Sequence, residues 1–260
     1  MRVDIDKAIK PVRRLRKLLK RIPSELMPEY VHKVRTQARK LEATAHAISL
    51  THDRRASRLL KEVKPLRKAA GKVRDMDVMI DKVLSMADGM EGDGRNALLR
   101  LTEEMAAARE KSAGGLRRLL RDEGKPLRRK LRGYARRMRK AEPDEVAESM
   151  AAPQILTVQL QHWPRLRAEN LHEFRIHAKE LRYMLQLIPE TDEHKLHAFS
   201  RVKDVAGEWH DWLQLREYAG KMLDGEADHA VLRRLGEIEH AKLRAALAAA
   251  NAVRHNGLAS

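Results

Sequence analysis

The sequence predicts an all-α protein of two similar helical bundles related by a pseudo-two-fold axis, and three observations support this. Helix-forming residues, chiefly Ala, Leu, Arg, Lys, Glu and Met, dominate the 260 positions, whereas alternating runs of β-branched and aromatic residues are nearly absent. Proline and glycine divide the chain into long segments with helical periodicity. One amphipathic pattern recurs 140 positions later, which is typical of an internal duplication.

The expected helices follow one another between helix-breaking residues. Proline cannot donate the backbone hydrogen bond of a helix interior, and glycine favours turns. These breaks are Pro23–Pro28, Asp88–Gly94, Gly124–Pro126, Pro143, Pro153, Pro189 and Gly225. Between them the periodicity predicts helices at about 5–21, 28–50, 54–87, 94–122, 126–140, 144–165, 169–188, 191–222 and 227–253. Pro65 lies inside the third helix, where we expect a kink or a helix start.

The acidic segment 141–153 separates the two halves, which we assign to residues 1–145 and 146–260. In each half a helix carries apolar residues at the same offsets of 0, 3, 7, 10, 14 and 17, the buried face of a bundle helix. The two stripes are Val31, Val34, Ala38, Leu41, Ala45 and Ile48, and Leu171, Phe174, Ala178, Leu181, Leu185 and Ile188.

Composition narrows the function. Lys and Arg number 54 against 37 Asp and Glu, a net charge of +17, which favours a polyanionic partner. The absence of cysteine excludes disulfides, iron–sulfur clusters and Cys-ligated zinc. No signal-peptide pattern and no apolar run long enough to span a bilayer occurs, so we expect a cytoplasmic protein that makes no contact with membranes.

A cationic row borders each apolar stripe, one position further along the chain. We call these rows the basic seams: the first is His32, Arg35 and Arg39, and the second is His172, Arg175, Lys179 and Arg182. Cations beside a core are partly desolvated and need a partner. That partner is either an internal carboxylate, with Asp75, Asp77 and Asp211 as candidates, or an anionic ligand in a groove.

The next helix in each half adds a second matched set, at a shift of 136 positions. Arg67, Gly71 and Arg74 share one helix face, as do Lys203, Gly207 and His210. A glycine within a helix costs about 1 kcal/mol relative to alanine. Its recurrence in both halves predicts close approach of either another helix or a ligand.

Two dense basic stretches, at 10–21 and 116–140, are expected to extend an anion-binding surface. The second contains 12 Lys and Arg against two acids, among them Arg128 and Arg132 on one helix face.

These motifs resemble the CHAD family, the conserved histidine α-helical domain. The first half carries His32-x-x-Arg35-x-x-x-Arg39-Lys40-Leu41 and Gly71-x-x-Arg74-Asp75, and the second carries Leu171-His172-x-x-Arg175 and Gly207-x-x-His210-Asp211. The resemblance implies two four-helix bundles around a basic channel that binds inorganic polyphosphate, with members found on polyphosphate granules. From the motifs and the matched helix faces together, we expect Lys40, Arg67, Arg74, Lys203 and His210 to contact the ligand beside the seams. Glu42 and Glu180 depart from the family pattern, because each stands where a basic residue is common.

Two other functions compete with polyphosphate binding. A nucleic-acid-binding protein would use the same charge, but single-strand binders usually stack bases on aromatic residues, and only nine are present. A metal-dependent phosphohydrolase would use pairs such as His194 and His197, for which no third ligand is evident. We therefore expect a non-catalytic protein without cofactor or metal; partner proteins cannot be named from the sequence.

Overall fold

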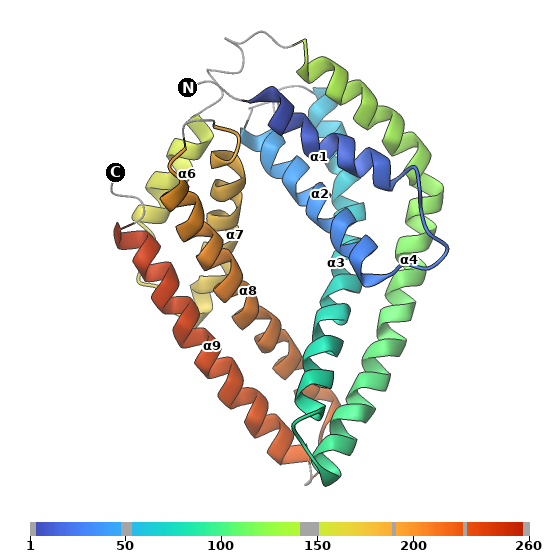
Figure 1. Ribbon diagram of the computed structural model, residues 1–260, viewed down its shortest axis with the longest axis vertical. Helices are drawn as coiled ribbons and strands as arrows, with labels where there is room; N and C mark the ends of the chain where they lie inside the picture. Colours follow the sequence, from blue (N-terminus) through green and yellow to red (C-terminus); the bar gives the residue numbers. More distant parts are fainter. Residues whose placement is uncertain (1–3, 48–53, 141–150, 189–190, 226–227, 257–260) are drawn as a thin grey trace.

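The computed structural model describes residues 4–47, 54–140, 151–188, 191–225 and 228–256. The first half contains α1 (Ile5–Leu18), α2 (Pro28–Ala47), α3 (Arg54–Ala87) and α4 (Gly92–Met138). The second contains α6 (Ala151–Gln161), α7 (Ala168–Leu185), α8 (Glu193–Met222) and α9 (His229–Asn256) (Figure 1). The described residues form no strand, so the all-α prediction is confirmed. No helix among them is long and apolar enough to cross a membrane.

The predicted break at Gly124–Pro126 is wrong. α4 continues through it as one helix of 47 residues. Leu120, Leu127 and Leu131 are buried on both sides of the proline, so packing outweighs the lost backbone hydrogen bond. Gly124 is buried, and a Cβ placed on it would lie 3.5 Å from Cδ1 of Ile22 in the α1–α2 connection. The glycine therefore serves close approach between segments and does not end the helix.

Several other boundaries move by a few residues. α1 ends at Leu18, before residue 21, and α7 ends at Leu185, before residue 188. α3 begins at Arg54, well before Pro65, so the expected helix start near that proline is wrong. The helix predicted for 144–165 is observed only as α6. The boundary between residues 145 and 146, the segment 141–150 and Ile48 lie outside the described residues.

Both predicted apolar stripes face the core. Val31, Val34, Ala38, Leu41 and Ala45 are fully buried. Leu171, Phe174, Ala178 and Leu181 are also fully buried, and Leu185 packs against the same cluster. Apart from Ala45, these residues belong to or pack against one apolar core that extends through both halves.

A second core joins the C-terminal parts of α3 and α8 to the N-terminal parts of α4 and α9. It contains Met79 and Val83 of α3, Leu98 and Leu101 of α4, Trp212 and Leu215 of α8, and Val231 and Leu235 of α9. Figure 1 shows these helix ends converging. α2 also packs against α7, and α3 against α8. These contacts fix the seam-bearing faces of α2 and α7 relative to each other and to α3 and α8.

Candidate functional site

Cations from four helices converge where the two halves meet. Burial, followed by the charges of Arg175 and His172 on α7 and of Arg35 and Arg39 on α2, lowers the pKa of His210 on α8 to about 3. His32 is affected in the same way: burial lowers its pKa, and so do cations on α3, α7 and α8. Such mutual effects require short distances, because charge interactions in solvent weaken within about 10 Å. The predicted seams therefore form one cationic cluster.

The most buried cations of this cluster lack carboxylate partners. Among the described residues, no carboxylate lies within ion-pair distance of Arg39, Arg175 or Lys179. Burial, followed by the charge of neighbouring arginines, lowers the pKa of Arg39 to about 10 and that of Lys179 to about 6. Desolvated cations that repel one another destabilise the free protein, which indicates a site built for an anion.

Internal carboxylates compensate only part of this charge. Asp75 accepts a hydrogen bond from Nη2 of Arg35 at 3.1 Å. Burial lowers the pKa of Arg175, and Asp211 opposes that shift without forming an ion pair with it. Asp77, the third candidate, instead accepts a 2.6 Å hydrogen bond from Nε of Arg109 in the first half. Of the three predicted carboxylates, Asp75 therefore contacts the cluster directly, Asp211 acts on it from a greater distance, and Asp77 is paired elsewhere.

The two acids that depart from the family pattern are both engaged. Oε2 of Glu42 lies 2.7 Å from Nε of Arg67, and Oε1 of Glu180 lies 2.8 Å from Nδ1 of His46. The second pair joins α7 to α2 across the two halves. The side chain of Arg67 is therefore less available to a ligand than the sequence suggested.

Two histidines form a close pair within the cluster. Nδ1 of His172 lies 3.2 Å from Nδ1 of His210, and the ring centroids are 4.1 Å apart. One of these nitrogens must carry a hydrogen and donate it to the other. Burial lowers the pKa of both rings, so both are neutral at pH 7 in the free protein. The matched residue His32 is more exposed than His172, and its Nε2 lies 3.5 Å from Oγ1 of Thr36.

Both recurring glycines lie under a seam arginine. A Cβ on Gly71 would lie 3.6 Å from Nε of Arg35, and one on Gly207 would lie 3.7 Å from Nη1 of Arg175. The close approach that the sequence predicted is therefore made by a guanidinium of the preceding helix. A Cβ at either position would make an ordinary van der Waals contact with that guanidinium.

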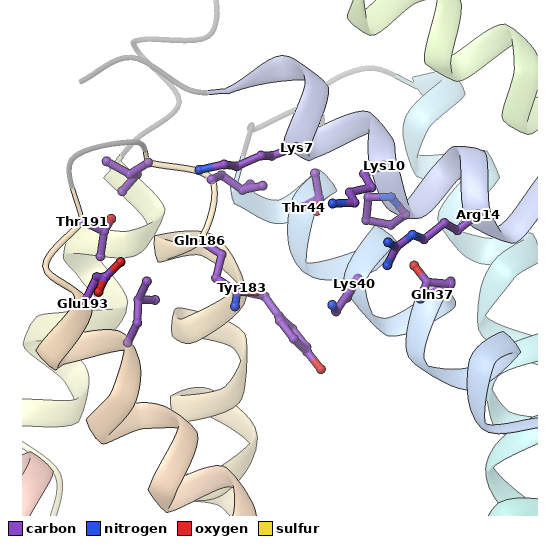
Figure 2. Close-up of a pocket in the computed structure, with 14 residues that line it drawn as sticks. Lys7, Lys10, Arg14, Gln37, Lys40, Thr44, Tyr183, Gln186, Thr191 and Glu193 are labelled. Atoms are coloured by element: carbon purple, nitrogen blue, oxygen red, sulfur yellow. The ribbon is translucent and has the colours of Figure 1, made fainter. Parts of the chain in front are cut away.

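Two cavities adjoin the cluster. One, of about 280 Å³, is lined by Arg39, Arg67, Arg175 and Lys179 together with the acids Glu42 and Glu180. The other, of about 430 Å³, lies between α1 and α2 on one side and α7 and the start of α8 on the other (Figure 2). Tyr183 lines both, with the guanidinium of Arg182 at 4.7 Å and Nζ of Lys40 at 5.7 Å from its ring centroid.

Of the remaining predicted contact residues, some lie at the cluster and others do not. Arg74 and Lys203 lie close enough to lower the pKa of His32, and Lys203 also lies 2.6 Å from Asp204. Arg128 and Arg132 do not join the cluster. They lie on α4, which packs mainly against α3 and α1, and neither lines the two cavities.

Sequence reasoning missed which residues of the 10–21 stretch face the site. Lys10 and Arg14 line the larger cavity, joined by Lys7, which precedes that stretch. Their offsets of 0, 3 and 7 equal those of His32, Arg35 and Arg39, and this periodicity could have identified them. His194 and His197 lie together at another cavity, yet no group of three or more potential metal ligands occurs among the described residues.

A family model described as the CHAD domain matches residues 12–220. The chain belongs to the CHAD domain family. The crystal structure of the CHAD domain from the plant Ricinus communis has the same fold, with a TM-score of 0.64 over 97% of this chain and 89% of that one. The two sequences are 19% identical, so this likeness concerns the fold. None of the curated proteins matches this CHAD domain.

Proposed function

We propose that this CHAD domain binds inorganic polyphosphate between the two basic seams, without catalysing a reaction on it. The observation that carries the proposal is a set of half-buried cations without a carboxylate partner among the described residues: Arg39, Arg175 and Lys179. A phosphate chain supplies closely spaced negative charges that such a set can neutralise together. Guanidinium groups suit this role because they can donate two parallel hydrogen bonds to one phosphate.

The surroundings of the cluster favour a polymer without bases. Among the described residues, Tyr183 is the only Phe, Trp or Tyr that lines the two adjoining cavities, and Arg182 and Lys40 approach its ring. Trp209 and Trp212 are buried in the two apolar cores. A nucleic acid would find its phosphates bound here but no free ring on which to stack its bases.

Binding of labelled long-chain polyphosphate to wild-type protein and to an Arg39→Gln/Arg175→Gln variant tests the proposal. At about 1.5 kcal/mol for each charged contact, the variant should bind about 100-fold more weakly. The matched control is Arg128→Gln/Arg132→Gln, which removes the same charge from α4 and should change affinity by less than about threefold. Equal losses in the two variants would show that net charge, and not this cluster, holds the polymer.

Competition separates polyphosphate from nucleic acid. At fixed salt and equal phosphate concentration, unlabelled polyphosphate should displace single-stranded DNA from the protein, and DNA should displace polyphosphate poorly. The reverse order would favour the nucleic-acid alternative. Release of orthophosphate from the bound chain would contradict a non-catalytic role. On this proposal we expect the protein in the cytoplasm, at polyphosphate granules.

A further inference from the structure

Helix α1 presents a row of cations to the larger of the two cavities. Lys7, Lys10 and Arg14 lie on one face of the helix and line the cavity of about 430 Å³ shown in Figure 2, together with Lys40 of α2. Gln37, Thr44, Gln186 and Thr191 supply further polar groups to its walls. We call this space the α1 cavity.

The cations of the α1 cavity are largely unpaired. Among the described residues, Lys10, Arg14 and Lys40 have no carboxylate within ion-pair distance. Nζ of Lys7 lies 3.9 Å from Asp4, a long and exposed contact. Glu193 is the one acidic residue lining the cavity. The cavity therefore carries a net positive charge that the protein itself does not balance.

Lys40 connects this cavity to the seams. Burial lowers its pKa, followed by the charges of Arg182 on α7, Arg14 and Lys10 on α1, and Lys203 on α8. One ammonium thus lies within electrostatic reach of both sets of cations. Tyr183 borders both cavities, so the positively charged surface continues past its ring.

The position of α1 is fixed on both sides of the cavity. Its buried residues, including Ile9, Val12 and Leu15, belong to the apolar core. At its start, the backbone N–H of Asp4 donates to the carbonyl of Leu187, just beyond α7, at 2.9 Å. The backbone positions that carry the cations of α1 are therefore fixed before any ligand arrives.

The two cavities differ in how much of their charge is already compensated. In the smaller one, Arg67 is paired with Glu42 and His46 with Glu180. The α1 cavity has no such pairs among its lining residues. A polyanion that extends beyond the seams is accordingly drawn toward α1.

We propose that the α1 cavity is a second phosphate-binding subsite, which takes the part of a polyphosphate chain that extends beyond the seams. The inference rests on the proposed function. On this proposal, the bound chain follows a path from the His172–His210 pair past Tyr183 to the α1 cavity. The proposal also predicts that α1 contributes only to chains long enough to occupy both places.

A Lys10→Gln/Arg14→Gln variant tests the subsite, with tripolyphosphate and long-chain polyphosphate as the two ligands. Long-chain affinity should fall about tenfold or more, since each lost contact is worth about 1 kcal/mol, while tripolyphosphate affinity should stay within about twofold. The matched control is Arg13→Gln/Lys17→Gln, which removes the same formal charge from two exposed positions of α1 that do not line the cavity and should leave both affinities within about twofold.

Three results would overturn the subsite: unchanged long-chain affinity, equal losses for both ligands, or equal losses in the control. The Arg39→Gln/Arg175→Gln variant separates this failure from failure of the proposed function. If it loses both ligands while Lys10→Gln/Arg14→Gln retains long-chain affinity, only the subsite is wrong. If it retains both ligands, the proposed function is wrong.

Discussion

Replacing Lys179 by methionine should stabilise the ligand-free protein while weakening polyphosphate binding. Burial, followed by the charges of Arg39, Arg175 and Arg35, lowers the pKa of Lys179 from 10.5 to about 6. At pH 7 this lysine is therefore mostly neutral in the folded chain and charged in the unfolded chain. At 1.36 kcal/mol per pKa unit, the interval from pH 7 to 10.5 corresponds to about 5 kcal/mol against folding, which partial contact with water reduces to about 2 kcal/mol.

Methionine has a similar length and no charge, so the variant should gain about 2 kcal/mol. In a chain of this size that raises Tm by roughly 4–8 °C. The gain depends on pH: the penalty on the wild type is complete below the folded pKa near 6 and disappears as pH rises to 10.5, where the unfolded lysine is also neutral. The difference in Tm should therefore be larger at pH 7 than at pH 10.

Thermal unfolding followed by circular dichroism at both pH values measures this difference. Lys72→Met, at an exposed position on α3, is the control and should change Tm little. A Lys179→Met variant that melts at or below the wild-type temperature at pH 7 would refute the reasoning, as would a gain of equal size at both pH values. Loss of polyphosphate affinity in the same variant would link the instability of the free site to its function.

Three further predictions follow from the same structure. Polyphosphate binding at pH 7 should take up protons and should strengthen from pH 8 to pH 6, because a bound polyanion raises the lowered pKa values of Lys179 and His172. Calorimetry in buffers of different ionisation enthalpy measures the proton uptake, and identical binding heats in all buffers would contradict the prediction. Asp77→Ala leaves the guanidinium of Arg109 without its carboxylate and should cost about 3–5 kcal/mol in urea unfolding, with polyphosphate affinity retained in the folded protein. Gly71→Ala should retain polyphosphate affinity and add about 0.5–1 kcal/mol of stability, since its Cβ would lie 3.6 Å from Nε of Arg35, an ordinary van der Waals contact. Gly71→Leu should displace that arginine and weaken binding. Equal affinities in the two variants would show that Arg35 is not part of the site.

Local patterns in the sequence predicted the helices and the faces on which they pack. The stripe from Val31 to Ala45 is buried because apolar residues at helical spacing share one face of a helix. The break predicted at Gly124–Pro126 failed for a physical reason as well. The cost of proline in a helix is a few kcal/mol, and burial of several flanking leucines can exceed it.

The sequence by itself determined that the protein is helical and basic, and it predicted an internal duplication with a row of cations beside the apolar face in each half. Those properties depend on residue type and on spacing along one helix. Only the tertiary structure decided which cations share a site. The packing of α2 on α7 and of α3 on α8 joins the seams, whereas Arg128 and Arg132 lie apart on α4. Lys10 and Arg14 of α1 line the α1 cavity. The tertiary structure also showed that Asp75 compensates one arginine while Arg39 and Lys179 have no carboxylate partner among the described residues. Burial and the distance between charges on different helices arise only when the helices pack, and these two quantities set the energy of each cation.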